Sequence, residues 1–267
     1  MNILVIGDVV GSPGRHIMKQ ALPKVLRKHD IDYCIANVEN AAGGFGVTKD
    51  VCDEVMALGV DCMTSGNHIW DKKEIVPLIG SIPQLLRPAN YPKGQPGKGS
   101  FVGRGKDSKT PVATLNLSGR VFMNGSIDDP FAEALAQVEA LRKEAKVIIV
   151  DFHGEASSEK NAMGHFLDGK VSAVFGTHTH VPTCDHRLLP KGTAFITDLG
   201  MTGPYDSVIG VEKDIILERF TTGMPRRFET AKLDPRFAAA VIRVDPATGR
   251  ALAIERMLLA EGDLANY

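Results

Sequence analysis

Residues 171–180 read Val-Ser-Ala-Val-Phe-Gly-Thr-His-Thr-His, an apolar run that closes on two histidines one residue apart. We interpret Val171–Phe175 as a buried strand that ends at Gly176, so that both imidazoles emerge from the loop at the end of the strand. Side chains two residues apart in an extended segment share a face. Neutral imidazole binds Mn, Fe, Zn or Ni, which makes His178 and His180 candidate ligands of neighbouring metal ions.

The rest of the chain alternates between predicted strands and helices. Strands are predicted at Met1–Gly7, Asp32–Asn37, Cys62–Thr64, Pro111–Leu117, Val147–Phe152, Arg187–Leu189 and Ala194–Thr197. Helices are predicted from Gly11 towards Lys28 with Ser12 as N-cap, from Thr48 to Leu58, and from Asp129 to Arg142. We interpret Pro92–Lys109 as a surface excursion, and Ala239–Val244 with Ala251–Met257 as a late hairpin. The alternation indicates an α/β fold, and we expect one domain over residues 1–267.

Composition disfavours several classes of protein. The chain has 267 residues, of which 43% are hydrophobic, and 31 basic against 32 acidic residues give a formal net charge of −1. Tight nucleic-acid binding is therefore not expected. Asp8 interrupts the first apolar run, which predicts neither a signal peptide nor a membrane span. The four cysteines lack CxxC spacing, which favours reduced thiols and a cytoplasmic location.

Polar side chains that can bind metals recur directly after the predicted strands. They are Asp8, Glu39, Asn40, Asn67, His68, His153, His178 and His180. Ligands of open α/β sheets bind at the carboxyl ends of the strands, so these loops would deliver carboxylate, amide and imidazole groups to one rim. A carboxylate such as Glu39 or Asp8 can bridge two ions about 4 Å apart. The sequence therefore predicts a dinuclear metal site.

Each of these residues also has a purely structural interpretation. Asp8 could cap the following helix, and Asn40 and Asn67 could occupy turns. His68 could begin a helix, and His153 could be a hydrogen-bonded core histidine. All of these interpretations would have to hold together for the metal site to vanish.

Five motifs, taken in order, make a more specific pattern. They are Gly7-Asp8-Val9-Val10-Gly11, Asn37-Val38-Glu39-Asn40, Gly66-Asn67-His68, Phe152-His153-Gly154-Glu155 and Gly176-Thr177-His178-Thr179-His180. The set resembles the calcineurin-like metallophosphoesterases, and within them it is most similar to the YmdB-like bacterial phosphodiesterases. The resemblance covers essentially the whole chain. It implies a four-layer α/β/β/α sandwich with a dinuclear site at one sheet rim.

The resemblance also implies a role for each site residue. The implied ligands are Asp8, His180 and Asn40 for the first ion, Asn67, His153 and His178 for the second, and Glu39 as the bridge. His68 would face the substrate as a transition-state stabiliser or general acid. Asp71 and Glu155 are candidates for supporting positions behind the ligands.

Two positions depart from the pattern of the broader superfamily. Its first motif usually reads Asp-x-His, and here the third position is Val10, which cannot bind metal. Its second motif usually supplies a bridging Asp, where this chain has Glu39 followed by Asn40. The YmdB-like branch shares both changes. The expected cofactor is a pair of divalent or mixed-valence metal ions. Exchanging a nitrogen donor for an oxygen donor shifts the preferred metal towards Fe or Mn.

The implied activity is hydrolysis of phosphodiester bonds of small nucleotides, 2′,3′-cyclic nucleotides in particular, by a metal-bound hydroxide. Two alternatives stay open: a phosphomonoesterase on the same metals, and a regulatory metal-binding protein with incidental catalysis. A dinucleotide-binding oxidoreductase is disfavoured, because Gly7, Gly11 and Gly14 do not meet the G-x-G-x-x-G spacing.

Contacts with the substrate are predicted with less support from the sequence. Met201, Thr202 and Gly203 lie in a glycine-flanked turn after an apolar strand, and we predict that they contact the substrate. Loop residues that could contact a base or a phosphate are Phe45, Arg87, Tyr91 and Tyr205. The family is compatible with a homo-oligomer, which no sequence feature here specifies.

Overall fold

The computed structural model describes residues 1–107 and 109–267. Its helices are α1 (Gly11–Lys28), α2 (Lys49–Ala57), α3 (Ile75–Leu78), α4 (Pro130–Leu141), α5 (Ser157–Leu167) and α6 (Lys213–Thr222), with 3₁₀ helices η1 (Ile79–Ser81) and η2 (Glu261–Asn266). Its strands are β1 (Asn2–Ile6), β2 (Asp8–Val9), β3 (Tyr33–Asn37), β4 (Cys62–Thr64), β5 (Ser100–Arg104), β6 (Pro111–Ser118), β7 (Val147–His153), β8 (Ala173–Thr177), β9 (Arg187–Leu188), β10 (Ala194–Ile196), β11 (Met201–Pro204), β12 (Pro235–Val244) and β13 (Ala251–Ala260).

The strands in these residues form two sheets. The seven-stranded sheet has the order β2-β11-β12-β1-β3-β4, with β13 paired to β12, and the six-stranded sheet has the order β5-β6-β7-β8-β10-β9. Strands β1, β3 and β4 run parallel in the first sheet, as do β6, β7, β8 and β10 in the second. Parallel neighbours end at the same edge, so each sheet presents a row of carboxyl ends.

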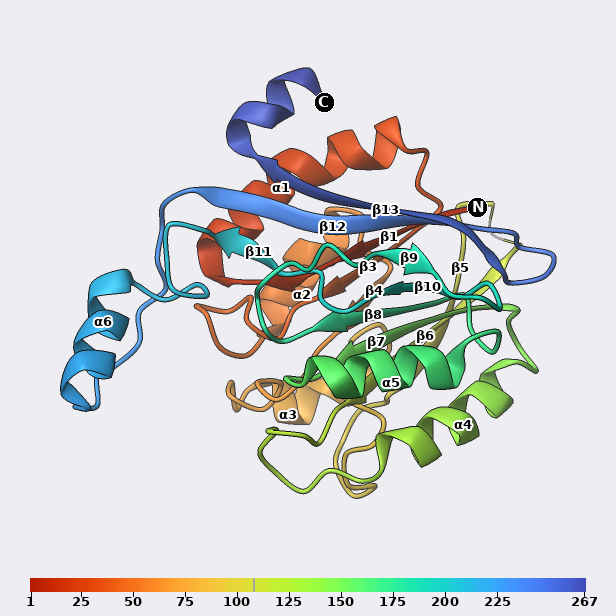
Figure 1. Ribbon diagram of the computed structural model, residues 1–267, viewed down its shortest axis with the longest axis horizontal. Helices are drawn as coiled ribbons and strands as arrows, with labels where there is room; N and C mark the ends of the chain where they lie inside the picture. Colours follow the sequence, from red (N-terminus) through yellow and green to blue (C-terminus); the bar gives the residue numbers. More distant parts are fainter. Residues whose placement is uncertain (108) are drawn as a thin grey trace.

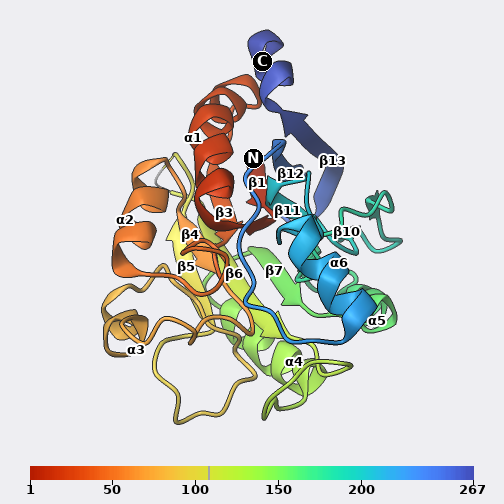
Figure 2. The same cartoon turned by 90° about the vertical axis from the view of Figure 1, so that its left-hand side faces the viewer.

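Alternation along the inner strands builds three cores, and these produce four layers. Ile3 and Val5 of β1 pack between the sheets, together with Ile149 of β7. Leu4 and Ile6 face the other way, into the core beneath α1 and α2. On the far side, the second sheet packs against α4 and α5. Figures 1 and 2 show α1 over one outer face and α4 and α5 over the other, which confirms the α/β/β/α sandwich.

Most predicted boundaries hold within a few residues, and the exceptions have local causes. The N-cap of α1 is Val10, so Ser12 already lies in the first turn and its predicted capping role is wrong. Thr48 and Asp129 do cap their helices, accepting hydrogen bonds from backbone N–H groups in the first turn. The predicted excursion Pro92–Lys109 contains β5, an edge strand antiparallel to β6.

Residues 205–234 form an excursion that the sequence did not predict. It leaves the seven-stranded sheet after β11, carries α6, and returns to the sheet at β12. Helix α6 stands apart from the sheets at the left of Figure 1, and in Figure 2 the chain after α6 passes in front of them. Among the described residues, none of the helices has the length and apolar character needed to cross a bilayer.

Candidate metal centre

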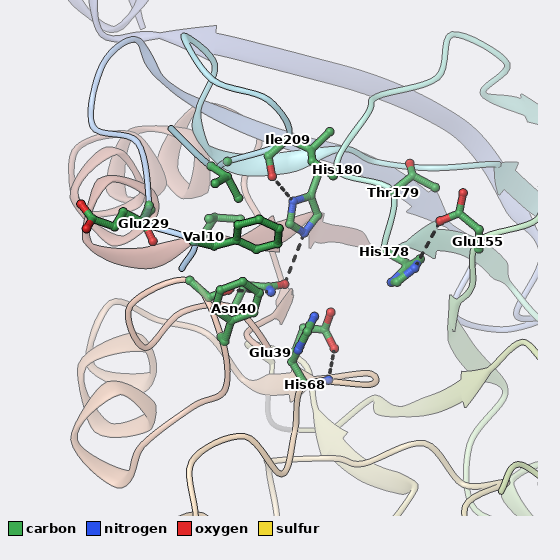
Figure 3. Close-up of a pocket in the computed structure, with 16 residues that line it drawn as sticks. Val10, Glu39, Asn40, His68, Glu155, His178, Thr179, His180, Ile209 and Glu229 are labelled. Carbon is green, nitrogen blue, oxygen red and sulfur yellow. Dashed lines mark hydrogen bonds and ion pairs between the residues drawn. The ribbon is translucent and has the colours of Figure 1, made fainter. Parts of the chain in front are cut away.

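The predicted ligands meet at the edge of the sandwich where the parallel strands of both sheets have their carboxyl ends. They come from the start of β2 (Asp8), the loops after β3 (Glu39, Asn40) and β4 (Asn67), the end of β7 (His153) and the loop after β8 (His178, His180). Figure 3 shows Glu39, Asn40, His178 and His180 directed towards a common cavity. Side chains up to 172 positions apart in the sequence are thus brought together because each follows the end of a strand, as the sequence motifs predict.

His153 Nε2 is the centre of one group of donor atoms. It lies 2.9 Å from Asn67 Oδ1, 3.1 Å from His178 Nδ1 and 3.2 Å from Glu39 Oε1. His153 is completely buried and Glu39 is nearly so. Within the described residues, donor atoms of Glu39, His153 and His178 all lie within 4.8 Å of one another, close enough to share a metal ion.

The hydrogen bonds behind His153 decide how its ring is protonated. Thr177 Oγ1 donates to Asp151 Oδ1 at 2.7 Å, so the hydroxyl oxygen accepts from His153 Nδ1 at 2.9 Å. If Nδ1 carries the only ring proton, the lone pair of Nε2 points towards the oxygen and nitrogen atoms of Asn67, His178 and Glu39. The donor set therefore fits a divalent metal ion.

In the metal-free protein, the neighbouring carboxylate of Glu39 favours the protonated form of His153. Burial alone would lower the pKa of His153, but the adjacent Glu39 carboxylate outweighs burial and raises the pKa. Burial would likewise raise the pKa of Glu39, but the ion pair and hydrogen bond with His153 lower it to about 2. A metal ion held by these donors would take the place of such a proton.

His180 and Asn40 present a second pair of donor atoms, with Asp8 close by against the backbone of His178. His180 Nδ1 donates to the carbonyl of Ile209 at 2.8 Å, which leaves Nε2 as a lone pair 3.3 Å from Asn40 Oδ1. Asn40 Nδ2 donates to Gly44 O at 2.9 Å, and this contact directs the amide oxygen towards His180. Asp8, which is fully buried, accepts from the backbone N–H of His178 at 3.1 Å. Burial lowers the pKa of His180, which keeps the ring neutral for ligation.

The backbone of the two-histidine loop differs from the predicted extended segment. His178 has φ 102° and His180 has φ 64°, both in the left-handed region that non-glycine residues rarely adopt. The two rings therefore reach different donor groups, His178 beside His153 and His180 beside Asn40. Strained backbone of this kind persists only where surrounding contacts hold it.

His68 lies at the edge of the cavity, with fixed orientation. Its Nδ1 is 2.8 Å from Asp71 Oδ2, and its backbone N–H donates to Glu39 Oε2 at 3.1 Å. The ring of Phe45 packs edge-on against it, with centroids 5.0 Å apart. Glu155, the other predicted supporting residue, reaches His178 Nε2 at 3.3 Å.

The predicted substrate contacts separate into two groups. Met201, Thr202 and Gly203 are buried in β11, where Thr202 Oγ1 bonds to the backbone of Ala238. In the part of the chain that the structure describes, the cavity is lined by other residues, so a direct contact of these three with substrate is not supported. Phe45 does line the cavity.

The remaining predicted contacts have structural roles instead. Arg87 donates to the carbonyls of its own loop, and Tyr205 donates to the carbonyl of Met201. Tyr91 is buried. The sequence prediction missed cavity residues from the excursion 205–234, chief among them Ile209, Val211 and Phe228. Their only signal in the sequence is a scatter of apolar residues between glycines.

Comparison with known proteins gives consistent matches over the whole length. A 2′,3′-cyclic-nucleotide 2′-phosphodiesterase of Bacillus subtilis (strain 168) is 48% identical over 260 residues, which cover 97% of each chain. A hypothetical protein from Thermus thermophilus has a crystal structure that superposes with a TM-score of 0.90 at 41% identity, covering 98% of this chain and 100% of that one.

The crystal structure of a novel phosphatase from Mycoplasma pneumoniae superposes with a TM-score of 0.91 at 33% identity, covering 97% and 93% of the two chains. The family of YmdB-like proteins matches residues 4–257. Fold, site geometry and these matches agree with the motif pattern, and the chain belongs to the YmdB-like family.

Proposed function

We propose that the protein is a dinuclear-metal phosphodiesterase that hydrolyses small nucleotides, with 2′,3′-cyclic nucleotides as the substrate class. The observation that carries the proposal is the group of donors around His153 Nε2, whose neighbours are Asn67 Oδ1, His178 Nδ1 and Glu39 Oε1. The name of the Bacillus subtilis relative supports the substrate class.

The donor groups support a ligand assignment for two ions, which we propose to be Fe or Mn. Asp8, Asn40 and His180 would hold one ion, Asn67, His153 and His178 the other, with Glu39 between them. Bound there, two such ions neutralise phosphate charge and lower the pKa of a coordinated water from about 16 towards about 7. The mixed oxygen and nitrogen donor set suits these metals.

His68 is the residue of the chain best placed to act on the leaving group. Its Nδ1 contacts Asp71, so its Nε2 is left for the substrate. From there it can donate a proton to the leaving oxygen or stabilise the charge that develops on it. The backbone bond from His68 to Glu39 keeps the imidazole in register with the ligands.

Two further properties belong to the proposal. The core between the sheets draws residues from both halves of the chain, which supports one metallophosphoesterase domain over residues 1–267. The four cysteines all lie in described residues and have free thiols, three of them buried, which supports a cytoplasmic location.

The test is hydrolysis of bis-p-nitrophenyl phosphate and p-nitrophenyl phosphate by Mn-loaded protein, compared with Glu39→Gln. The diester should turn over faster than the monoester, and Glu39→Gln should lose more than about 100-fold, because even outer partners of metal ligands are worth roughly 10–100-fold. Glu54→Gln, at an exposed ion pair with Arg15, is the matched control and should behave as wild type.

The outcomes separate the competing functions. A preference for the monoester would replace the proposal with a phosphomonoesterase. Turnover that survives Glu39→Gln, or no metal-dependent turnover of either ester, would refute the two-metal assignment. If the diester is preferred, a panel of 2′,3′-cyclic nucleotides then tests the substrate class.

A further inference from the structure

The donor atoms occupy one side of a cavity of about 190 Å³, and most of its other side is apolar. The proposed ligands and His68 account for much of the polar lining, and its other polar residues are Glu155, Thr179, Glu229 and Thr230. The apolar side is made by Val10, Phe45, Ile209, Val211 and Phe228, none of which takes part in the chemistry proposed above. Figure 3 shows Val10 and Ile209 on the same side of the cavity as His180, next to the donor atoms. An apolar wall beside a phosphate-binding centre must meet a part of the substrate other than the phosphate.

Phe45 is held in this wall by its loop and by His68. The loop after β3 contains Gly43, Gly44 and Gly46, all with positive φ, and it folds sharply enough to turn Phe45 into the cavity. The Phe45 and His68 rings meet edge to face at an interplanar angle of 63°. The aromatic ring is therefore fixed next to the residue proposed to face the leaving group.

Phe228 is brought to the same cavity by the excursion 205–234, whose two arms pair at its base. Val211 and Thr230 form an antiparallel bridge, and Ala231 N donates to Gly210 O at 2.9 Å. The returning arm lies against the loop after β3, where a Cβ on Gly44 would be only 2.5 Å from Thr230 Oγ1. This packing anchors the residues that flank Phe228.

One face of the Phe228 ring already has a partner. The guanidinium of Arg219, on α6, lies 4.8 Å from the ring centroid. Arg219 occupies one face of the ring and not the other, and Phe228 is half-buried and lines the cavity. Rings that are supported from behind and open towards a cavity are suited to stacking a planar group.

We propose that Phe45 and Phe228 form a nucleobase subsite, which rests on the phosphodiesterase function above and deepens it. The cavity is smaller than the roughly 300–1,000 Å³ of pockets for drug-sized ligands, so it takes a single base. Base–aromatic stacking changes affinity by about 5- to 150-fold per base and tolerates any base, because every base has a π face. The subsite therefore selects nucleotides over other diesters without selecting one nucleotide strongly.

The experiment compares two substrates that share the reacting group. Adenosine 2′,3′-cyclic phosphate carries a base, and methyl riboside 2′,3′-cyclic phosphate does not. Phe228→Ala should lower kcat/KM for the nucleotide by about 5- to 150-fold, mainly through KM, and leave the baseless diester unchanged. Phe220→Ala, on the same excursion but 77% exposed on α6, is the matched control and should leave both substrates unchanged.

A second measurement does not depend on catalysis. Adenosine should bind the metal-free protein in calorimetry, more weakly to Phe228→Ala and to Phe45→Ala, and as in wild type to Phe220→Ala. Equal losses on both substrates, or adenosine binding that Phe228→Ala leaves intact, would overturn the subsite. If wild type hydrolyses neither diester, the phosphodiesterase function fails, and adenosine binding alone then decides whether the subsite exists.

Discussion

Replacing Lys160 with Met removes the positive charge that neutralises the buried carboxylate of Asp198. Both side chains are about 1% exposed, and Lys160 Nζ lies 2.6 Å from Asp198 Oδ2. Lys160 also donates to the carbonyl of Thr177 at 2.8 Å. Asp198 accepts from Thr179 N at 3.2 Å and from Gly200 N at 2.8 Å. The pair thus ties down the chain on both sides of His178.

The size of the effect follows from burial. Removing one partner of a buried ion pair leaves an uncompensated charge and costs about 3–5 kcal/mol of unfolding free energy. Typical domains have only about 5–15 kcal/mol in total. Adding Asp198→Asn to Lys160→Met should recover part of the loss, because the remaining buried group is then neutral. Lys213→Met, at an exposed pair with Asp206, is the control and should change stability little.

Urea unfolding of the metal-free protein measures the loss, and metal titration of the folded variant measures its consequence for the site. His178 and His180 have strained backbone that costs on the order of 1–3 kcal/mol each. If Lys160 holds that loop, Lys160→Met should bind metal more weakly even where it is fully folded. A loss of stability below about 1 kcal/mol would refute the charge argument. Unchanged metal affinity would show that the pair supports the core and not the loop.

Three further predictions concern the ligands. Gly66→Ala should lower bound metal by more than about tenfold by elemental analysis, because its Cβ would lie 2.1 Å from His153 Nε2; full metal content would contradict this. Thr177→Val should weaken metal binding by about 10–100-fold in calorimetry while Thr177→Ser does not, because only the hydroxyl joins His153 to Asp151. Metal affinity should rise with pH, since burial raises the pKa of Asp8 well above its usual range and a metal cation must displace the proton from the Asp8 carboxyl. Calorimetry in two buffers should detect the released proton. A metal affinity that does not change with pH would contradict this prediction.

The strands and the gathering of the donor side chains could be predicted because each depends on a local rule. Ile3 to Ile6 are all apolar, since alternate residues face different cores and neither face meets water. Asp8 and Glu39 come two residues after the ends of β1 and β3, where a charge is out of place unless the apolar strand has ended. Parallel pairing then brings these ends together without any further information.

Other elements could not be predicted, because their residues are satisfied only by distant partners. Helix α5 buries Glu159 and Lys160, charges that sequence patterns assign to solvent. In the fold, Glu159 accepts from the backbone of Arg120 and Lys160 pairs with Asp198. Strand β11 is a similar case. It is a short segment after a glycine, and the two strands that pair with it, β2 and β12, come from the two ends of the chain. Phe228 was missed for the same reason.

The two departures from the superfamily pattern become intelligible together in the structure. Val10, where a histidine is usual, lines the cavity as part of its apolar wall, so the exchange removes a nitrogen donor and leaves apolar surface in its place. Asn40 places an amide oxygen beside His180, which would replace the lost donor without adding charge. The proposed ligand set then contains two carboxylates, Asp8 and Glu39, among amides and imidazoles, while Glu155 contacts the far nitrogen of His178. Two divalent ions held by this set would bring four positive charges against those of the two carboxylates, and the surplus would favour an anionic phosphodiester.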